Sequence, residues 1–157
     1  MTLAEQKTAQ RKAGIAARRA LSDAERTKAN AALCARIMTL DCFKRAETIL
    51  LYAAFCGEAD LAALAVEAAR QGKTLAYPVC GEGFSLTAAV PGPDGWEVGA
   101  YGIRTPILSR SAVLRPDQLD LVLVPCTAFD AACRRVGMGK GYYDRYLPRC
   151  IRAVKLG

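Results

Sequence analysis

The feature that most constrains the fold is an apolar run at residues 119–125, followed by a glycine-rich loop at residues 137–141. An apolar run of this length, closed by a proline, is typical of a buried strand. The glycines at 137, 139 and 141 alternate with other residues and surround Lys140. Alternate glycines let a backbone approach a ligand closely and turn its amide N–H groups toward one anion. The pattern indicates either a phosphate site or a tight strand-to-helix turn with solvated basic side chains.

A single acidic residue accompanies this loop. Asp144 is the only carboxylate between residues 131 and 157, a segment that also holds Arg134, Arg135 and Arg145. Magnesium is commonly bound in proteins by one or two carboxylates together with phosphate oxygens. One acid among many bases therefore suits a metal ion held beside a phosphate, with Asp144 as its candidate ligand.

The net charge of +7 is concentrated at the two ends of the chain. Residues 1–45 and 134–157 are strongly basic, whereas the residues between them are net acidic. If the two ends meet in the fold, they make one anion site; otherwise they are separate solvated faces or a nucleic-acid patch. Because no aromatic residue interrupts the N-terminal charges, binding of single-stranded nucleic acid is the weaker interpretation.

Two capping boxes predict the first two helices. Each pairs a Thr or Ser with a glutamate three residues later, namely Thr2 with Glu5 and Ser22 with Glu25. We therefore expect helices over residues 3–20 and 23–39. The first helix presents one basic stripe, formed by Lys7, Arg11 and Arg18. Its other apolar positions are mostly alanine, so the helix should dock lightly.

The following segments alternate between strand and helix patterns. We expect a buried strand at 48–53, a helix from Asp60 to about 71, and a second strand at 73–78. This order predicts a parallel sheet with a right-handed crossover. Weaker patterns indicate a short edge strand at 84–88, a helix after Asp144 to about 148, and a last strand at 151–156. Trp96 and Tyr101 either cover the core or stack on a flat ligand ring.

The cysteine usage predicts a reducing compartment. The seven cysteines form no CxxC pair, and the chain has no histidine, so a zinc site is not expected. We interpret the cysteines as free thiols that act mainly as small apolar fillers. No apolar run is long enough to span a membrane, and the first residues lack the apolar core of a signal peptide. These features predict a cytoplasmic protein.

The long C-terminal string is far more specific than its glycines alone. It resembles the signature of the 5-formyltetrahydrofolate cyclo-ligase family, also called 5,10-methenyltetrahydrofolate synthetase. The matching residues are Pro125, Ala128-Phe129-Asp130 and Arg135-Val136-Gly137-Met138-Gly139-Lys140-Gly141-Tyr142-Tyr143-Asp144-Arg145-Tyr146-Leu147. Three positions depart from the family pattern, since Cys126 and Cys133 stand where glycines are usual and Val136 replaces a leucine. The cysteines matter if those backbones need a positive φ, which costs a non-glycine residue about 1 kcal/mol or more.

The resemblance implies a fold and a reaction. The fold would be α/β, three layers with a mostly parallel central sheet, akin to the sugar-phosphate isomerase and CoA-transferase group. Residues 1–157 would form a single domain that lacks the C-terminal segment of the family. The reaction would be the ATP- and Mg²⁺-dependent cyclisation of 5-formyltetrahydrofolate to 5,10-methenyltetrahydrofolate, with release of ADP and phosphate. We expect a monomer that binds neither nucleic acid nor a membrane.

The resemblance also assigns the site. Lys140 and Arg135 would be catalytic, and Asp144 would hold Mg²⁺. The ATP contacts would be Lys7, Arg11, Arg135, Val136, Gly137, Met138, Gly139, Lys140, Gly141, Tyr142 and Tyr143. The folate contacts would be Ala53, Glu58, Met138, Gly139, Lys140, Gly141 and Tyr142.

Three other functions stay open at this point. The chain could be a degenerate family member that binds nucleotide or folate without turnover. The reasons are the cysteines at 126 and 133, Thr105 in place of a usual acid, and the shorter C-terminus. A basic nucleic-acid-binding module and an anion-accepting isomerase of the same fold group are the others.

Overall fold

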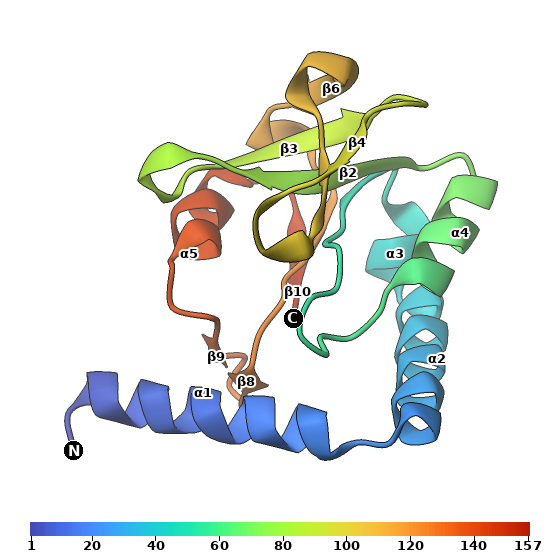
Figure 1. Ribbon diagram of the computed structural model, residues 1–157. Helices are drawn as coiled ribbons and strands as arrows, with labels where there is room; N and C mark the ends of the chain where they lie inside the picture. Colours follow the sequence, from blue (N-terminus) through green and yellow to red (C-terminus); the bar gives the residue numbers. More distant parts are fainter.

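A six-stranded sheet runs through the molecule in the order β10-β7-β1-β2-β3-β6 (Figure 1). The computed structural model describes residues 1–157, except for the side chain of Ala100. Four strands pair in parallel, namely β10 (Val154–Leu156), β7 (Leu121–Leu123), β1 (Thr48–Leu50) and β2 (Thr74–Cys80). Two antiparallel strands complete the sheet, β3 (Leu86–Pro91) and β6 (Ser111–Leu114). The prediction of a mostly parallel sheet is confirmed.

The central strands are mostly apolar because both of their faces are buried. Ile49 in β1 packs into one core cluster, together with Leu121 in β7. Their neighbours Leu50 and Val122 point to the opposite face and into a second cluster. All four side chains are fully buried. The continuous apolar runs of the sequence are therefore the signature of a sheet that is covered on both sides.

Helices supply these two covers. On one face lie α2 (Asp23–Thr39), α3 (Asp41–Arg45) and α4 (Ala62–Arg70), whose apolar side chains share a cluster with β1 and β7. The other face is covered by α5 (Tyr142–Tyr146) and the 3₁₀ turn η5 (Leu147–Arg149). Figure 1 shows the two sets on opposite sides of the strands. The predicted three-layer α/β fold is thus confirmed.

The first helix belongs to neither layer. α1 (Leu3–Ala20) lies across the carboxyl-end side of the sheet, against the hairpin of β8 (Ala128–Phe129) and β9 (Arg135–Val136) (Figure 1). Both predicted capping boxes are formed, at the start of α1 and of α2. None of the residues of α1 is buried. The predicted light docking is therefore confirmed.

Several elements differ from the prediction. The strand expected at 84–88 is present as β3, but it begins only at Leu86, because Phe84 ends the 3₁₀ turn η1 (Glu82–Phe84). The predicted edge position is wrong, because β6 pairs with the outer side of β3. The helix expected after Asp144 already begins at Tyr142, and α4 begins at Ala62, although Asp60 Oδ1 accepts the Ala62 N–H. Unexpected elements are α3, the β8–β9 hairpin, β6, the pair β4 (Trp96–Val98) and β5 (Arg104–Pro106), and the turns η2 (Ala100–Gly102), η3 (Leu108–Arg110) and η4 (Pro116–Gln118).

The cysteines are free, as expected, but they do not share one role. Cys34 and Cys150 are buried and fill apolar space, whereas Cys56, Cys80 and Cys133 are exposed. The filler interpretation is therefore wrong for the exposed three. Among the residues that the structure describes, no helix combines the length and the apolar character that a membrane crossing requires.

Candidate active site

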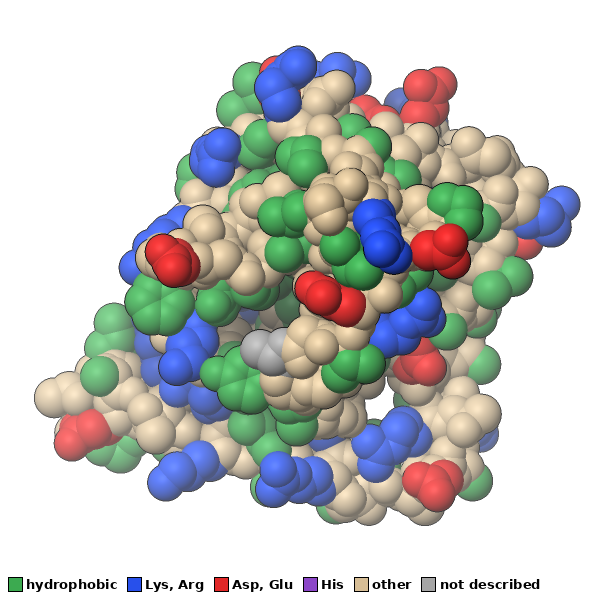
Figure 2. Space-filling view, turned by 45° about the horizontal axis from the view of Figure 1, so that its top comes forward, with side chains coloured by type: hydrophobic (Ala, Val, Ile, Leu, Met, Phe, Trp, Pro, Cys, Tyr) green, Lys and Arg blue, Asp and Glu red, His purple; other side chains and the backbone are tan. Residues whose placement is uncertain are grey.

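The two basic ends of the chain meet at the glycine-rich loop. Arg11 Nε donates a hydrogen bond to the Gly137 carbonyl at 2.7 Å. Arg18 Nη2 donates to the Cys126 carbonyl at 2.6 Å. Between them, Gly14 lies so close to Thr127 that an added Cβ would overlap the Thr127 carbonyl oxygen. Arg11 and Arg18 of the basic stripe therefore lie on the docked face of α1, whereas Lys7 is exposed. Figure 2 shows Lys and Arg side chains spread over the visible face of the molecule.

The loop itself depends on two of its three glycines. Gly139 has φ +95° and Gly141 has φ +77°, a region that side chains rarely adopt. A Cβ on Gly139 would also lie 3.3 Å from Nη2 of Arg11, so the guanidinium reaches the loop backbone closely. The φ of Gly137 lies outside this region. Lys140 is exposed between the two constrained glycines, where its ammonium can meet an anion from solvent.

The predicted metal ligand is held by an arginine. Arg135 Nη2 lies 2.7 Å from Asp144 Oδ1; the Arg135 side chain is 20 % exposed and the Asp144 side chain 76 %. Among the described side chains, no three His, Cys, Asp or Glu residues gather as a metal cage. One accessible carboxylate beside a glycine-rich loop is a donor set that suits Mg²⁺ when phosphate oxygens supply further ligands. The residues present therefore fit such an ion.

Glu58 lies where the sequence predicted it, in the loop between β1 and α4. Its Oε2 accepts the Phe55 N–H at 3.0 Å. Partial burial raises the pKa of the Glu58 carboxyl, against the lowering effects of the Phe55 N–H and of the Arg18 charge. Arg18 belongs to the basic stripe of α1, and the sequence predicted no role for it in the site. Only the fold could reveal that it approaches both Glu58 and the Cys126 carbonyl.

Tyr143 brings an unpaired hydroxyl to the same region. The hydroxyl oxygen is buried, and no hydrogen-bond partner for it exists among the described residues. Burial raises the pKa of this phenol, and the nearby Cys80, Glu58 and Tyr52 raise it further. Buried hydroxyls are nearly always hydrogen-bonded, so this one calls for an explanation. A ligand acceptor between the glycine loop and Glu58 would provide it.

Two residues for which the sequence predicted no contact in the site brace the glycine loop. Arg145 Nη1 donates to the carbonyls of Lys140 and Gly141, each at 3.2 Å. The guanidinium carbon lies 5.4 Å from the ring centre of Phe84, whose ring also meets Tyr142 edge to face at 5.7 Å. Phe84 keeps φ +57°, an unusual conformation for an aromatic residue. A strained turn of the β2–β3 connection thus supports the loop that carries Lys140.

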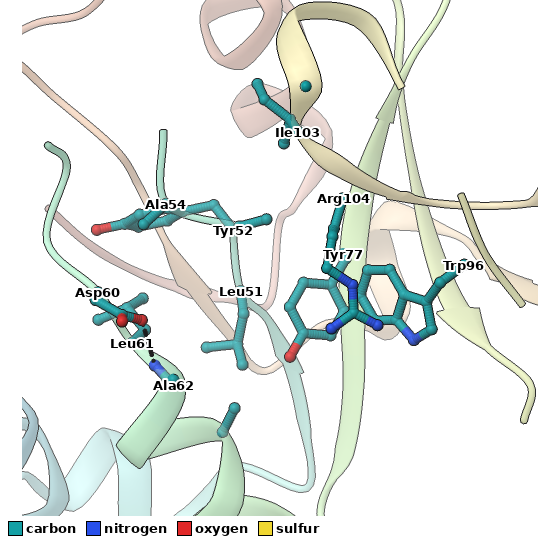
Figure 3. A pocket seen from close by; sticks show the side chains of 13 residues that line it. Leu51, Tyr52, Ala54, Asp60, Leu61, Ala62, Tyr77, Trp96, Ile103 and Arg104 are labelled. Carbon is teal, nitrogen blue, oxygen red and sulfur yellow. Dashed lines mark hydrogen bonds between the residues drawn. The ribbon is translucent and has the colours of Figure 1, made fainter. Parts of the chain in front are cut away.

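A cavity of about 360 Å³ opens beside the end of β1 (Figure 3). Ala53, a predicted folate contact, lines it, together with Tyr52, Tyr77, Trp96 and Arg104. The Trp96 ring packs on Tyr77 edge to face at 4.8 Å and still borders the cavity. Trp96 therefore packs against a neighbouring aromatic ring, one of its two predicted roles, and stacking on a ligand ring stays a prediction. Tyr101 is largely exposed, with its ring 6.1 Å from that of Phe55.

Most of the predicted contacts converge on the loop. The loop residues 137–141 lie beside Arg11, Arg135 and Asp144, with Val136 in β9 and Met138 half-exposed. Tyr142 and Tyr143 follow at the start of α5. Lys7 is exposed on α1, one turn before Arg11, and Ala53 lines the separate cavity. Asp130 holds the β8–β9 turn by accepting the N–H groups of Ala132 and Arg134.

Comparison with known proteins decides the family. The profile of the 5-formyltetrahydrofolate cyclo-ligase family matches residues 3–156. The chain belongs to this family of enzymes. The 5-formyltetrahydrofolate cyclo-ligase of Escherichia coli K12 is 31% identical over 133 residues, which cover 83% of this chain and 73% of that protein.

Two solved structures of 5,10-methenyltetrahydrofolate synthetases have the same fold as this chain. The NMR structure of Aquifex aeolicus 5,10-methenyltetrahydrofolate synthetase superposes with a TM-score of 0.81 at 33% identity, covering 96% of this chain and 77% of the other. The synthetase from Mycoplasma pneumoniae gives a TM-score of 0.73 at 23% identity, covering 91% and 77%, and supports the fold alone.

Proposed function

We propose that the protein is an active 5-formyltetrahydrofolate cyclo-ligase that uses ATP and Mg²⁺. The observation that carries this proposal is the meeting of α1 with the glycine-rich loop, which places Arg11 against Gly137 and Gly139 beside Lys140. Such an arrangement suits a triphosphate, because phosphoryl transfer requires mainly positioning and charge neutralisation. It also explains how a site without histidine can do its chemistry.

In the proposed reaction the formyl oxygen attacks the γ-phosphorus of ATP, and ADP leaves. N10 of the folate then attacks the activated formyl carbon. The carbon–oxygen bond breaks, phosphate departs with the former formyl oxygen, and N10 loses its proton, giving 5,10-methenyltetrahydrofolate. Phosphorylation is needed because the formyl oxygen by itself is a poor leaving group.

Each group of the site has a place in this scheme. Lys140 and Arg135 neutralise the transferred phosphoryl group, Lys7 and Arg11 bind the remaining phosphates, and the loop amides from 136 to 143 surround them. Asp144 would hold Mg²⁺, which when bound would supply neutralisation of phosphate charge. Glu58 and Tyr142 orient the pterin, and the buried Tyr143 hydroxyl donates to a ligand oxygen or nitrogen.

The test is a spectroscopic assay. We expect ATP-dependent growth of the near-ultraviolet absorbance of the methenyl product when protein, 5-formyltetrahydrofolate, Mg²⁺ and ATP are mixed. Lys140→Ala should lower kcat by at least about 100-fold, because the ammonium acts on charge that develops in the transition state. Its circular dichroism should be unchanged, since Lys140 is exposed.

Two outcomes would contradict the proposal. Near-wild-type turnover by Lys140→Ala would refute its phosphate role. A flat trace from the wild type, with ATP still bound in calorimetry, would instead favour a family member that binds nucleotide without turnover.

A further inference from the structure

An arginine on β5 faces the cavity of Figure 3 without an acidic partner. Arg104 borders the cavity, with its guanidinium carbon 4.5 Å from the ring centre of Trp96. The ion pairs among the described side chains do not include Arg104. A guanidinium stacked on an aromatic face keeps its N–H donors directed outward from its edge. The group is therefore arranged to receive a carboxylate or another planar anion.

The rest of the cavity is a slot for a flat group. Tyr77 and Trp96 form one wall with Arg104, and Leu51, Tyr52 and Ala54 lie across from them (Figure 3). Its volume of about 360 Å³ lies within the range of small-molecule sites. Aromatic walls with a single cation match a ligand that combines a flat ring with a negative charge.

One carboxylate also borders the cavity, and its position matters. Asp60 lies on the wall opposite Arg104 (Figure 3). Its Oδ1 accepts the Ala62 N–H at 2.9 Å, so the charge is engaged at the first turn of α4. The two walls therefore differ in sign, and an anionic ligand end is directed toward Arg104.

We propose that this cavity binds the aminobenzoyl-glutamate portion of the folate substrate, with a glutamate carboxylate at Arg104 and the aminobenzoyl ring against Trp96 and Tyr77. The inference rests on the proposed function and adds a subsite to it. Ala53 connects the cavity to the end of β1, and Tyr52 borders it while lying close enough to Glu58 for the two to interact electrostatically. A folate whose pterin lies near Glu58 can therefore extend its other end into the slot.

A binding experiment can test the subsite without turnover. Trp96 is the only tryptophan in the chain, so its fluorescence reports on this cavity alone. N-(4-aminobenzoyl)-glutamate is titrated without ATP, with calorimetry in parallel as a check on optical artefacts. We expect saturable binding that Arg104→Gln weakens about tenfold, the loss of one charge-assisted contact. The matched control is Arg149→Gln, because the Arg149 guanidinium also lies over an aromatic ring, 6.0 Å from that of Tyr146.

Two further experiments test the contribution of the ligand's charge and the effect of the subsite on turnover. The neutral diamide of the same ligand should bind wild type and Arg104→Gln equally weakly. In turnover, Arg104→Gln should raise KM for 5-formyltetrahydrofolate about tenfold and leave kcat and the KM for ATP near wild type.

Equal binding of the acid to wild type and to Arg104→Gln would overturn the subsite, as would equal binding of acid and diamide to wild type. If those results came with normal wild-type turnover, the proposed function would stand without the subsite. Arg104-dependent binding without wild-type turnover would leave the subsite in place and contradict the proposed function.

Discussion

Replacing Gly14 with alanine should release α1 from the site while leaving the rest of the fold intact. An added Cβ would overlap the Thr127 carbonyl oxygen. Thr127 cannot easily move, because its N–H and its hydroxyl both donate to the Val136 carbonyl, at 2.7 and 2.8 Å. The helix must therefore shift, and it then loses the bonds from Arg11 to Gly137 and from Arg18 to Cys126.

The magnitude follows from these contacts. The two lost bonds are charge-assisted but partly exposed, so together they contribute about 2–3 kcal/mol to docking. Against this, alanine favours an isolated helix over glycine by about 1 kcal/mol. Because no residue of α1 is buried, the free energy of global unfolding should fall by less than about 2 kcal/mol.

Limited trypsin digestion is the direct assay, because α1 carries five cleavage sites at Lys7, Arg11, Lys12, Arg18 and Arg19. We expect cuts within α1 to be at least about tenfold faster in Gly14→Ala than in wild type. The KM for ATP should rise, since Arg11 no longer faces the loop. Thr8→Ala is the matched control, an exposed change on the same helix that also favours helix. Unchanged cleavage of α1 in Gly14→Ala would refute the close approach and the docking derived from it.

The other predictions concern backbone strain and a buried charge. Cys133 adopts φ +59°, so Cys133→Gly should raise the free energy of unfolding by up to about 1 kcal/mol. The φ of Cys126 is not positive, so Cys126→Gly should lower the free energy of unfolding by about 0.5–1 kcal/mol. Denaturant titration under reducing conditions measures both changes, and two changes of the same sign would contradict the backbone strain inferred at Cys133. Burial raises the pKa of Glu58, so the folded state holds this proton more tightly than the unfolded state and stability falls as pH rises through the interval above the ordinary glutamate pKa. Glu58→Gln, which can still accept the Phe55 N–H, should therefore melt higher than wild type at pH 7 and like wild type near pH 4; melting curves parallel at every pH would show that Glu58 is not desolvated.

The parts of the fold that follow local rules could be predicted from the sequence. The capping boxes at Thr2 and Ser22 fix the starts of two helices through contacts three residues apart, and the apolar runs around Leu50 and Val122 require a doubly covered sheet. Of the two cysteines at usual glycine positions, Cys133 has a positive φ and Cys126 does not. The candidate site residues came from the family signature, because periodicity alone could not indicate them.

The missed features depend on contacts between distant segments. The strands of the β8–β9 hairpin are two residues each, too short to show any alternation. The sequence predicts a strand from Phe84, but the contacts of its ring with Tyr142 and Arg145 hold this residue in a turn. The stacking of Arg104 on Trp96 depends on the pairing of β4 with β5, and strands of three residues are too short to be predicted from the sequence pattern.

The docking of α1 has a consequence for how this enzyme tolerates change. Arg11 and Arg18 bind carbonyl oxygens, which every residue type carries, so the loop at 126 and 137 can alter its side chains without losing the helix. Cys126 illustrates this freedom, since its carbonyl receives Arg18 although a cysteine stands at a usual glycine position. The docking instead requires particular residues in the helix, namely Arg11, Gly14 and Arg18. Random mutagenesis should therefore find α1 intolerant at these three surface positions and permissive at Cys126, whose carbonyl Arg18 binds.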